Sequence, residues 1–201
     1  MSQIKAVIWD LAGVVLHAVK GTFSTLLAER LDAPLAEIER LMGSKENNLW
    51  DINEIDDDAY YTFLLKELNM PMEKKAILRK FVLDDFYIDQ EMLAYIKKIQ
   101  ETVTTMLLTN FPAHVHDFMK TDWIVDGAFD HIIASCDVKL IKPDPAIYTL
   151  ALERLGYEAE ECVFIDDREV NVKAAQELGI TGIVFQGKSQ TMSDLDTLLQ
   201  K

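Results

Sequence analysis

The chain has 201 residues, of which 49% are hydrophobic and 27% are charged, the balance of a folded protein with one core or a core plus an inserted subdomain. Its 20 basic and 34 acidic residues give a net charge of −14, which argues against nucleic-acid and anionic-membrane partners. No apolar run approaches a membrane span or a signal-peptide core, and the two cysteines, Cys136 and Cys162, lack metal-site spacing, so we expect a cytoplasmic protein with reduced thiols.

Short apolar runs predict five buried strands, at residues 6–9, 103–108, 131–134, 162–165 and 182–185. Helical patterns separate most of these runs. The predicted helices cover 89–100, with Asp89 as N-cap, then 144–156, which begins at Asp144-Pro145 and ends at Gly156, and about 168–178. Strands that alternate with helices predict an α/β fold, with a parallel sheet covered by helices on both faces.

Residues 18–88 follow a different pattern, because amphipathic helices alone are predicted there and no strand candidate of comparable quality occurs. We interpret this segment as an insertion into the α/β unit. Its acidic run, Asp56-Asp57-Asp58, precedes a helical pattern, and acids at a helix start favour the helix dipole. We therefore prefer helix capping over a cation site for these three residues.

The polar residues that carry chemistry follow the predicted strands. Asp10 ends the first strand, Thr109-Asn110 the second and Asp166-Asp167 the fourth, and Lys142 lies in the loop after the third. In a parallel α/β sheet the loops at the carboxyl ends of the strands converge on one crevice, where ligands bind. The sequence therefore brings together one ammonium group, one hydroxyl and three carboxylates.

This set suits phosphoryl transfer, in which a carboxylate attacks phosphorus and Mg²⁺ offsets the negative charge. Asp10, one of the Asp166-Asp167 pair and a backbone carbonyl near Ala12 would supply oxygen ligands to the ion. Lys142 would neutralise Asp10 and a phosphate oxygen, and Thr109 would bind another oxygen. Singly, such residues are more often turn residues, helix caps or surface lysines, but their occurrence at successive strand ends favours a site.

Four segments resemble the ordered motifs of the haloacid dehalogenase-like (HAD) superfamily. They are Val-Ile-Trp-Asp-Leu-Ala-Gly-Val-Val, Leu-Leu-Thr-Asn, Lys142-Pro143 and Phe-Ile-Asp-Asp-Arg-Glu-Val-Asn. The resemblance covers the whole chain. It implies a Rossmann-like core of residues 1–17 and 89–201, with an all-helical cap at 18–88 over the site.

The same resemblance implies the roles of individual residues. Asp10 would form an aspartyl-phosphate, Asp167 would bind the metal directly, and Asp166 would bind it through water or lie behind the direct ligands. Asn171 would support Lys142 or the metal, and Asn110 would belong to the substrate-binding motif. Within the superfamily, the chain is similar to the small capped phosphatases, such as bacterial α-glucose-1-phosphatase and the phosphatase domain of soluble epoxide hydrolase, so a small phosphorylated metabolite is the expected substrate.

Ala12 departs from the family's pattern, in which most phosphatases carry a second Asp two residues after the nucleophile. That acid protonates the leaving group and then activates water, a contribution of roughly 10²- to 10⁴-fold in rate. Its absence predicts a slow or selective phosphatase that favours good leaving groups, such as sugar 1-phosphates or acyl phosphates. His17 is one candidate replacement, although a loop histidine without a chemical role is the preferred interpretation.

Two alternatives stay open. A 2-haloacid dehalogenase also uses an Asp nucleophile and needs no second acid, but dehalogenases that resemble this fold lack the paired acids found at Asp166 and Asp167. A non-catalytic phosphate-binding regulatory protein would agree with Ala12, and the retained Asp10 and Lys142 weigh against it. His114 and His116 are expected on a helix surface, Trp50 and Arg168 are candidate substrate contacts, and the substrate and the oligomeric state stay open.

Overall fold

A parallel sheet forms the centre of the computed structural model, which describes residues 3–121, 125 and 127–200. Its five strands lie in the order β5-β4-β1-β6-β7. They are β1 (Ala6–Trp9), β4 (Thr104–Thr109), β5 (His131–Ala134), β6 (Cys162–Asp166) and β7 (Thr181–Val184). All five were predicted to within one residue at either end, and β1, which carries Asp10 at its end, is the middle strand.

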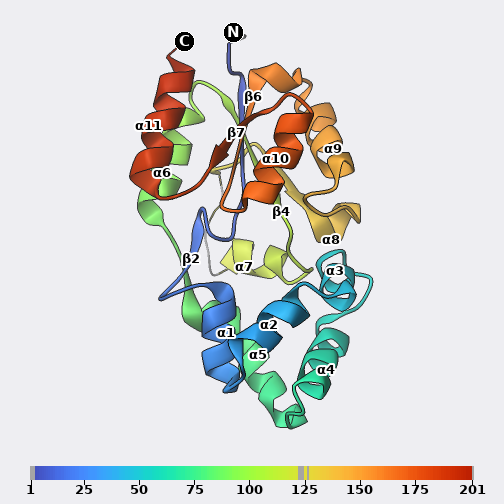
Figure 1. Cartoon of the computed structure of the whole chain (residues 1–201). Coiled ribbons are helices and arrows are strands. Elements are labelled where there is room, and N and C mark those ends of the chain that lie inside the picture. Colours follow the sequence, from blue (N-terminus) through green and yellow to red (C-terminus); the bar gives the residue numbers. More distant parts are fainter. Residues whose placement is uncertain (1–2, 122–124, 126, 201) are drawn as a thin grey trace.

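Helices cover both faces of this sheet (Figure 1). Side chains alternate along β1, so that Val7 and Trp9 face α6 (Gln90–Ile99) and α11 (Lys188–Leu199), whereas Ala6 and Ile8 face α9 (Pro145–Leu155) and α10 (Glu169–Glu177). Two apolar clusters result, one on each face. The α/β class with a Rossmann-like parallel sheet is thereby confirmed.

The helix ends follow the predicted capping chemistry. Asp89 accepts hydrogen bonds from the amides of Glu91 and Met92 at the start of α6. Asp144 accepts one from the Ala146 amide at the start of α9, and Gly156 ends that helix with a left-handed backbone, φ +70°. These local signals set the direction in which each helix returns across the sheet.

Five helices between β1 and α6 lie beneath the carboxyl ends of the strands (Figure 1). We call residues 23–85 the helical insertion; its helices are α1 (Phe23–Leu31), α2 (Leu35–Met42), α3 (Lys45–Asp51), α4 (Asp57–Glu67) and α5 (Lys75–Asp85). Asp56 accepts a hydrogen bond from the Ala59 amide and caps α4, which confirms the capping interpretation of that residue.

The connection between core and insertion contains two strands, neither of which was predicted. The strand β2 (Leu16–Ala18) pairs antiparallel with β3 (Phe86–Ile88), and Leu16 lies opposite Ile88. The expectation of helices alone over residues 18–88 is therefore wrong at both ends, since Ala18 belongs to β2 and residues 86–88 form β3. Three residues are too few to show a period, and each strand depends on a partner about 70 positions away in the chain.

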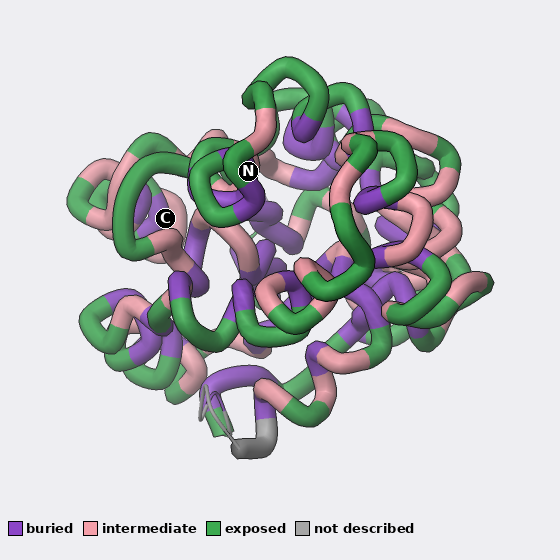
Figure 2. Tube along the Cα trace, turned by 90° about the horizontal axis from the view of Figure 1, so that it is seen from below, coloured by how far each residue is buried: buried purple, intermediate pink, exposed green. Residues whose placement is uncertain are grey.

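Figure 2 shows the buried segments gathered inside the molecule and the exposed ones on outer turns. Both cysteines are free, in agreement with the expected reduced thiols, and both are buried, with Cys136 in the short helix α8 (Ser135–Val138) and Cys162 in β6. Among the described residues, we find no helix with the length and apolar character needed to cross a bilayer.

Candidate active site

Asp10 lies at the centre of the carboxyl edge of the sheet. Its amide donates to the Ile165 carbonyl, and the residue is only about 6% exposed. One carboxylate oxygen, Oδ1, accepts a hydrogen bond from the Leu11 amide at 2.7 Å. The same oxygen forms an ion pair with Lys142 Nζ, also at 2.7 Å. The other oxygen has no hydrogen-bond partner among the described residues, so the carboxylate is held in place with one oxygen free.

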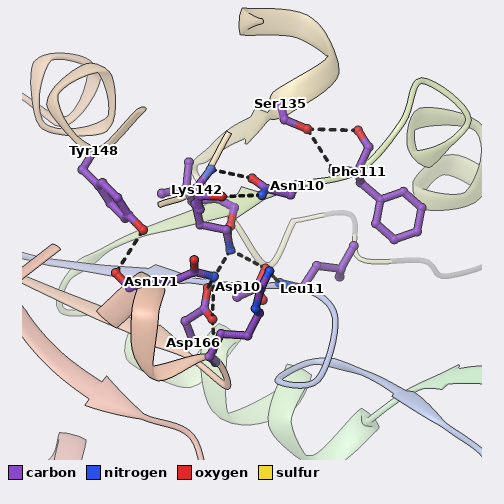
Figure 3. Close-up of polar contacts among 11 residues, drawn as sticks. Asp10, Leu11, Asn110, Phe111, Ser135, Lys142, Tyr148, Asp166 and Asn171 are labelled. Atoms are coloured by element: carbon purple, nitrogen blue, oxygen red, sulfur yellow. Dashed lines mark hydrogen bonds and ion pairs between the residues drawn. The ribbon is translucent and has the colours of Figure 1, made fainter. Parts of the chain in front are cut away.

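Lys142 is a buried cation with three acceptors. Its Nζ lies 2.7 Å from both Asp10 Oδ1 and Asp166 Oδ2, and it donates to the Leu108 carbonyl at 2.9 Å (Figure 3). The Asn110 side chain holds the Lys142 backbone through two hydrogen bonds of 2.9 Å, one to its carbonyl and one from its amide. The Asn110 amide is therefore committed to placing the lysine.

Asp166 is surrounded by donors from its own side of the sheet. It accepts hydrogen bonds from the Asn171 side chain at 3.0 Å and from the Arg168 amide at 2.8 Å, in addition to Lys142. Tyr148 donates to the Asn171 carbonyl at 3.0 Å (Figure 3). Asn171 therefore supports Lys142 indirectly, because it positions the carboxylate to which the lysine is paired.

The electrostatic balance at this edge is negative, since three carboxylates lie beside one ammonium group. Burial, together with Asp166 and Asp167, raises the pKa of Asp10 to about 7, against the opposing effect of Lys142. Burial alone would lower the pKa of Lys142, but Asp10 and Asp166 raise it above its ordinary value. Burial, and then Asp166, also raises the pKa of Asp167. A cation placed here would relieve this repulsion.

The side chains and backbone present fit a hard divalent cation. Oxygens of Asp10, Asp166 and Asp167 lie within 4.8 Å of one another. Asp166 already has protein partners for both oxygens, whereas Asp167 is exposed and lies directly over Gly13, where an added Cβ would come within 2.5 Å of Asp167 Oδ2. Asp10 and Asp167 are therefore the carboxylates that have an oxygen to offer.

The turn after β1 leaves the backbone carbonyl of Ala12 available at this place. The Leu11 carbonyl accepts hydrogen bonds from the amides of Val15 and Leu16, and the Gly13 amide donates to the Leu16 carbonyl at 2.8 Å. The Ala12 carbonyl accepts no hydrogen bond from the described residues. Gly13 makes the turn with φ +87°, a conformation that favours glycine.

Thr109 ends β4 beside Asp10 and has an unsatisfied hydroxyl. The side chain is fully buried, and its Oγ1 has no hydrogen-bond partner among the residues that the structure describes. A buried hydroxyl without a partner is costly, so this group is suited to bind an oxygen atom of a ligand. Thr109, Asp10, Lys142 and the Asp166-Asp167 pair are thus brought together at one edge, as the strand ends predicted.

The helical insertion contacts this edge through the end of α3. Ser135 donates from Oγ to the Asp51 carbonyl at 2.6 Å and accepts a hydrogen bond from the Phe111 amide at 2.9 Å. Sequence reasoning did not single out Asp51. Only its position one residue after Trp50, in a segment expected to lie over the site, could have drawn attention to it.

Two histidines are placed differently from one another. His114, expected on a helix surface, instead contacts the insertion: its Nδ1 lies 3.1 Å from Asp57 Oδ1, and its ring packs against Trp50. The expectation fails because the helix pattern does not show what lies opposite. His17 forms a hydrogen bond with the Val14 carbonyl at 3.1 Å and packs against the rings of Tyr87 in β3 and Phe185 after β7, which gives it a structural role.

Trp50 and His116 also have partners within the protein. Trp50 stacks on Tyr60, with ring centroids 4.1 Å apart, and donates from Nε1 to Asp57. His116 lies partly exposed, 2.9 Å from Asp137 Oδ1, in agreement with its expected surface position. Trp50 therefore belongs to the interior of the insertion, where it contacts the core through His114.

Comparison with known proteins places these features in a family. The haloacid dehalogenase-like hydrolases match residues 4–179. A sesquiterpene phosphatase of Aspergillus oryzae is 25% identical over 98% of both chains, and a phosphorylated carbohydrates phosphatase of Thermotoga maritima is 28% identical over 98% of this chain and 91% of its own. Flavin mononucleotide hydrolase 1 of Arabidopsis thaliana is 29% identical over 63% of this chain, which spans 58% of that protein.

Solved structures share the fold. A HAD-like family hydrolase from Porphyromonas gingivalis superposes with a TM-score of 0.81 at 22% identity over the whole of both chains. A HAD family enzyme from Bacteroides thetaiotaomicron, solved with magnesium and inorganic phosphate, gives 0.74 at 22% identity, over 92% of this chain and 96% of its own. With a family match over most of its length and the strand-end residues gathered at one edge, the chain belongs to the haloacid dehalogenase-like hydrolases.

Proposed function

We propose that the protein is a Mg²⁺-dependent phosphatase that hydrolyses a small phosphate ester through an aspartyl-phosphate on Asp10. The observation that carries the proposal is the fixed Asp10 carboxylate, with one oxygen free, between the Lys142 ammonium and the exposed Asp167 carboxylate. The phosphatases among the relatives support the same reaction class.

Asp10, Asp167 and the Ala12 carbonyl would bind the ion directly. Asp166, which is paired with Lys142, would lie behind these ligands or bind the ion through water. When bound, Mg²⁺ supplies positive charge that offsets the charges of the nucleophile and the phosphate. The magnesium and phosphate in the Bacteroides structure agree with this assignment. Relief of the repulsion among Asp10, Asp166 and Asp167 is the physical reason to expect an ion here.

The protein's own groups would perform the transfer in two steps. The free oxygen of Asp10 attacks phosphorus, and the phosphorus–oxygen bond to the leaving group breaks. The Thr109 hydroxyl would bind a phosphoryl oxygen, and the Lys142 ammonium group, which stays in place because Asn110 holds its backbone, would offset the negative charge of the phosphoryl group. Water then attacks the aspartyl-phosphate, which releases inorganic phosphate and restores the Asp10 carboxylate.

The domain division and the substrate follow from the same proposal. Residues 1–17 and 89–201 would form the core, and residues 18–88 a cap whose contacts select the substrate. Because Ala12 cannot transfer a proton, we expect slow or selective turnover that favours sugar 1-phosphates and acyl phosphates. The Thermotoga phosphatase supports a phosphorylated carbohydrate as substrate. A cytoplasmic location stays a prediction.

Two other functions are competing outcomes of the same test. A dehalogenase would require no ion, so the exposed Asp167 carboxylate over Gly13 would have no purpose in it. A phosphate-binding regulatory protein would bind through Lys142 and Thr109 without turnover. The acid cluster of Asp10, Asp166 and Asp167 favours the phosphatase over the dehalogenase, and the free oxygen of Asp10 favours it over the regulatory protein.

Hydrolysis of p-nitrophenyl phosphate with Mg²⁺ or with EDTA tests the proposal, and Asp10→Asn is the control. We expect Mg²⁺-dependent release of p-nitrophenol from the wild type and none above background from the variant. Acid quenching during turnover of phosphorus-labelled substrate should leave label on the wild-type protein only. Chloride release from 2-chloropropionate in EDTA would instead identify a dehalogenase, and phosphate binding without turnover a regulatory protein.

A further inference from the structure

The proposed reaction lacks a proton donor on the core side of the site. The leaving oxygen needs a proton when its bond to phosphorus breaks, and the Ala12 methyl group cannot supply one. Lys142 is occupied by three acceptors, and His17 bonds the Val14 carbonyl within the β2–β3 connection. A donor must therefore come from the helical insertion or from solvent.

Asp51 is an acid of the insertion that lies close to the carboxyl edge of the sheet. It ends α3, and its carbonyl accepts the 2.6 Å hydrogen bond from Ser135 Oγ. Ser135 in turn accepts the 2.9 Å hydrogen bond from the Phe111 amide, two residues after Thr109. The Asp51 backbone is thus fixed to the segments that follow β4 and β5.

One charge on the opposite side of the site affects the Asp51 carboxylate. Arg168, which follows Asp167 at the end of β6, acts on this carboxylate through its charge. In the strand order β5-β4-β1-β6-β7, the strands β4 and β6 flank β1 on its two sides. Asp51 is therefore fixed on the β4–β5 side of this edge, and its carboxylate lies within range of a charge on the β6 side.

A chain of polar contacts orients the Asp51 side chain and leaves one oxygen available. Asn47 donates from Nδ2 to Asp51 Oδ2 at 3.0 Å, and Tyr60 donates from its hydroxyl to Asn47 Oδ1 at 2.6 Å. Asp51 Oδ1 has no hydrogen-bond partner among the described residues. Burial raises the pKa of Asp51 to about 7, against the opposing effects of Arg168 and Asn47, which suits proton exchange near neutrality.

We propose that Asp51 is the general acid and base of this enzyme, in place of the aspartate that most phosphatases of the family have at the position of Ala12. The inference rests on the proposed phosphatase function. In the first step Asp10 attacks phosphorus, the leaving oxygen keeps the electron pair of the broken bond, and it takes the proton of the Asp51 carboxylic acid. In the second, the Asp51 carboxylate takes a proton from the attacking water, the pair of the breaking bond returns to Asp10, and inorganic phosphate leaves.

Asp51→Asn tests the proposal, because asparagine keeps the size of the side chain and an oxygen that can accept from Asn47. The matched control is Glu54→Gln, which changes an exposed acid three residues away whose partner is Lys139 at 3.7 Å. Each protein is assayed with Mg²⁺ on p-nitrophenyl phosphate, a good leaving group, and on β-glycerol phosphate, a poor one. Circular dichroism and thermal unfolding establish that each variant is folded.

We expect Asp51→Asn to lower kcat on β-glycerol phosphate by about 100-fold and to change kcat on p-nitrophenyl phosphate by less than about threefold. Glu54→Gln should match the wild type on both substrates. Ala12→Asp added to Asp51→Asn should restore turnover of the poor substrate, because it returns an acid to the usual position. Restoration would separate proton transfer from a structural role.

Three results would overturn the inference. One is an equal loss on both substrates, and another is a higher KM with unchanged kcat, which would mean that Asp51 only binds substrate. The third is wild-type turnover of both substrates with no effect of Asp51→Asn, which would reject Asp51 and leave the proposed phosphatase intact. A wild type that turns over neither substrate would reject the phosphatase and Asp51 together.

Discussion

The core and the helical insertion contribute polar groups to the same place in opposite ways. On the core side, Lys142, Asp166 and Asn171 are buried and each is bound to several others, so they form a closed network. On the insertion side, the Asp51 carboxylate is bound to one neighbour through one oxygen. The difference teaches that core substitutions should cost stability as well as activity, whereas substitution of Asp51 should cost turnover alone.

The largest effect is expected from Lys142→Met, which tests whether the core network is structural. Removal of the ammonium group leaves Asp10 and Asp166 buried beside each other without their cation, at a cost of about 3–5 kcal/mol in the free energy of unfolding. Phosphatase activity should be lost as well. Urea unfolding measures the first and p-nitrophenyl phosphate hydrolysis the second.

Lys173→Met is the matched control for Lys142→Met, since that lysine pairs with Glu169 on the exposed surface of α10. We expect it to change neither the unfolding midpoint nor the activity measurably, because exposed ion pairs contribute little. Equal midpoints for the two variants would contradict the description of Lys142 as the centre of a buried network.

Gly13→Ala should have a smaller effect on stability than Lys142→Met, and it should specifically weaken the binding of Mg²⁺. The new Cβ would lie 2.5 Å from Asp167 Oδ2, so the carboxylate has to move, and the backbone φ of +87° is unfavourable for alanine. The Mg²⁺ concentration for half-maximal activity should rise by about 10- to 100-fold, as when a group that positions a metal ligand is lost. Mg²⁺ titration of the activity provides the measurement.

Gly156→Ala separates backbone strain from contact with Asp167. Gly156 also has a left-handed backbone, with φ +70°, but nothing lies within 4 Å of its added Cβ. Both variants should lose a similar amount of stability from strain, roughly 1 kcal/mol. Only Gly13→Ala should change the Mg²⁺ requirement, and a change in both would remove the argument that Gly13 exists to admit Asp167.

The same contrast explains what the sequence could predict. Asp10, Thr109 and Asp166 could be found because each ends a short apolar run, and parallel strands place such ends together by topology alone. The β2–β3 pair could not, because its strands are three residues long and lie about 70 positions apart. Asp51 and His114 were missed for a related reason: their neighbours depend on how the insertion packs on the core, which helix periodicity does not encode.

The smallest effect concerns the pH dependence of turnover that Asp51 would impose. The pKa of Asp51, and so this pH dependence, is set by the groups that face its carboxylate. Arg168 acts on it from the end of β6, Asn47 from its own helix and Tyr60 from α4. Burial and Asp51 raise the pKa of Tyr60, so the phenol stays neutral near pH 7. Lys139 binds the carbonyls of Ile52 and Asn53 just beyond α3. Arg168 is therefore the cation whose removal should change the titration of Asp51 most directly.

Arg168→Gln should move the alkaline limb of the kcat/KM profile for β-glycerol phosphate to higher pH. A general acid acts in its protonated form, so the wild-type rate should fall as pH rises through the Asp51 pKa of about 7. The Arg168 charge lowers that pKa, and its loss therefore lets the acid keep its proton to higher pH. With saturating Mg²⁺, Lys173→Gln, in the helix that follows Arg168, should leave the limb in place, and Asp51→Asn should abolish it. An Arg168→Gln limb that coincides with the wild-type limb would show that the titrating group is not the carboxylate facing Arg168.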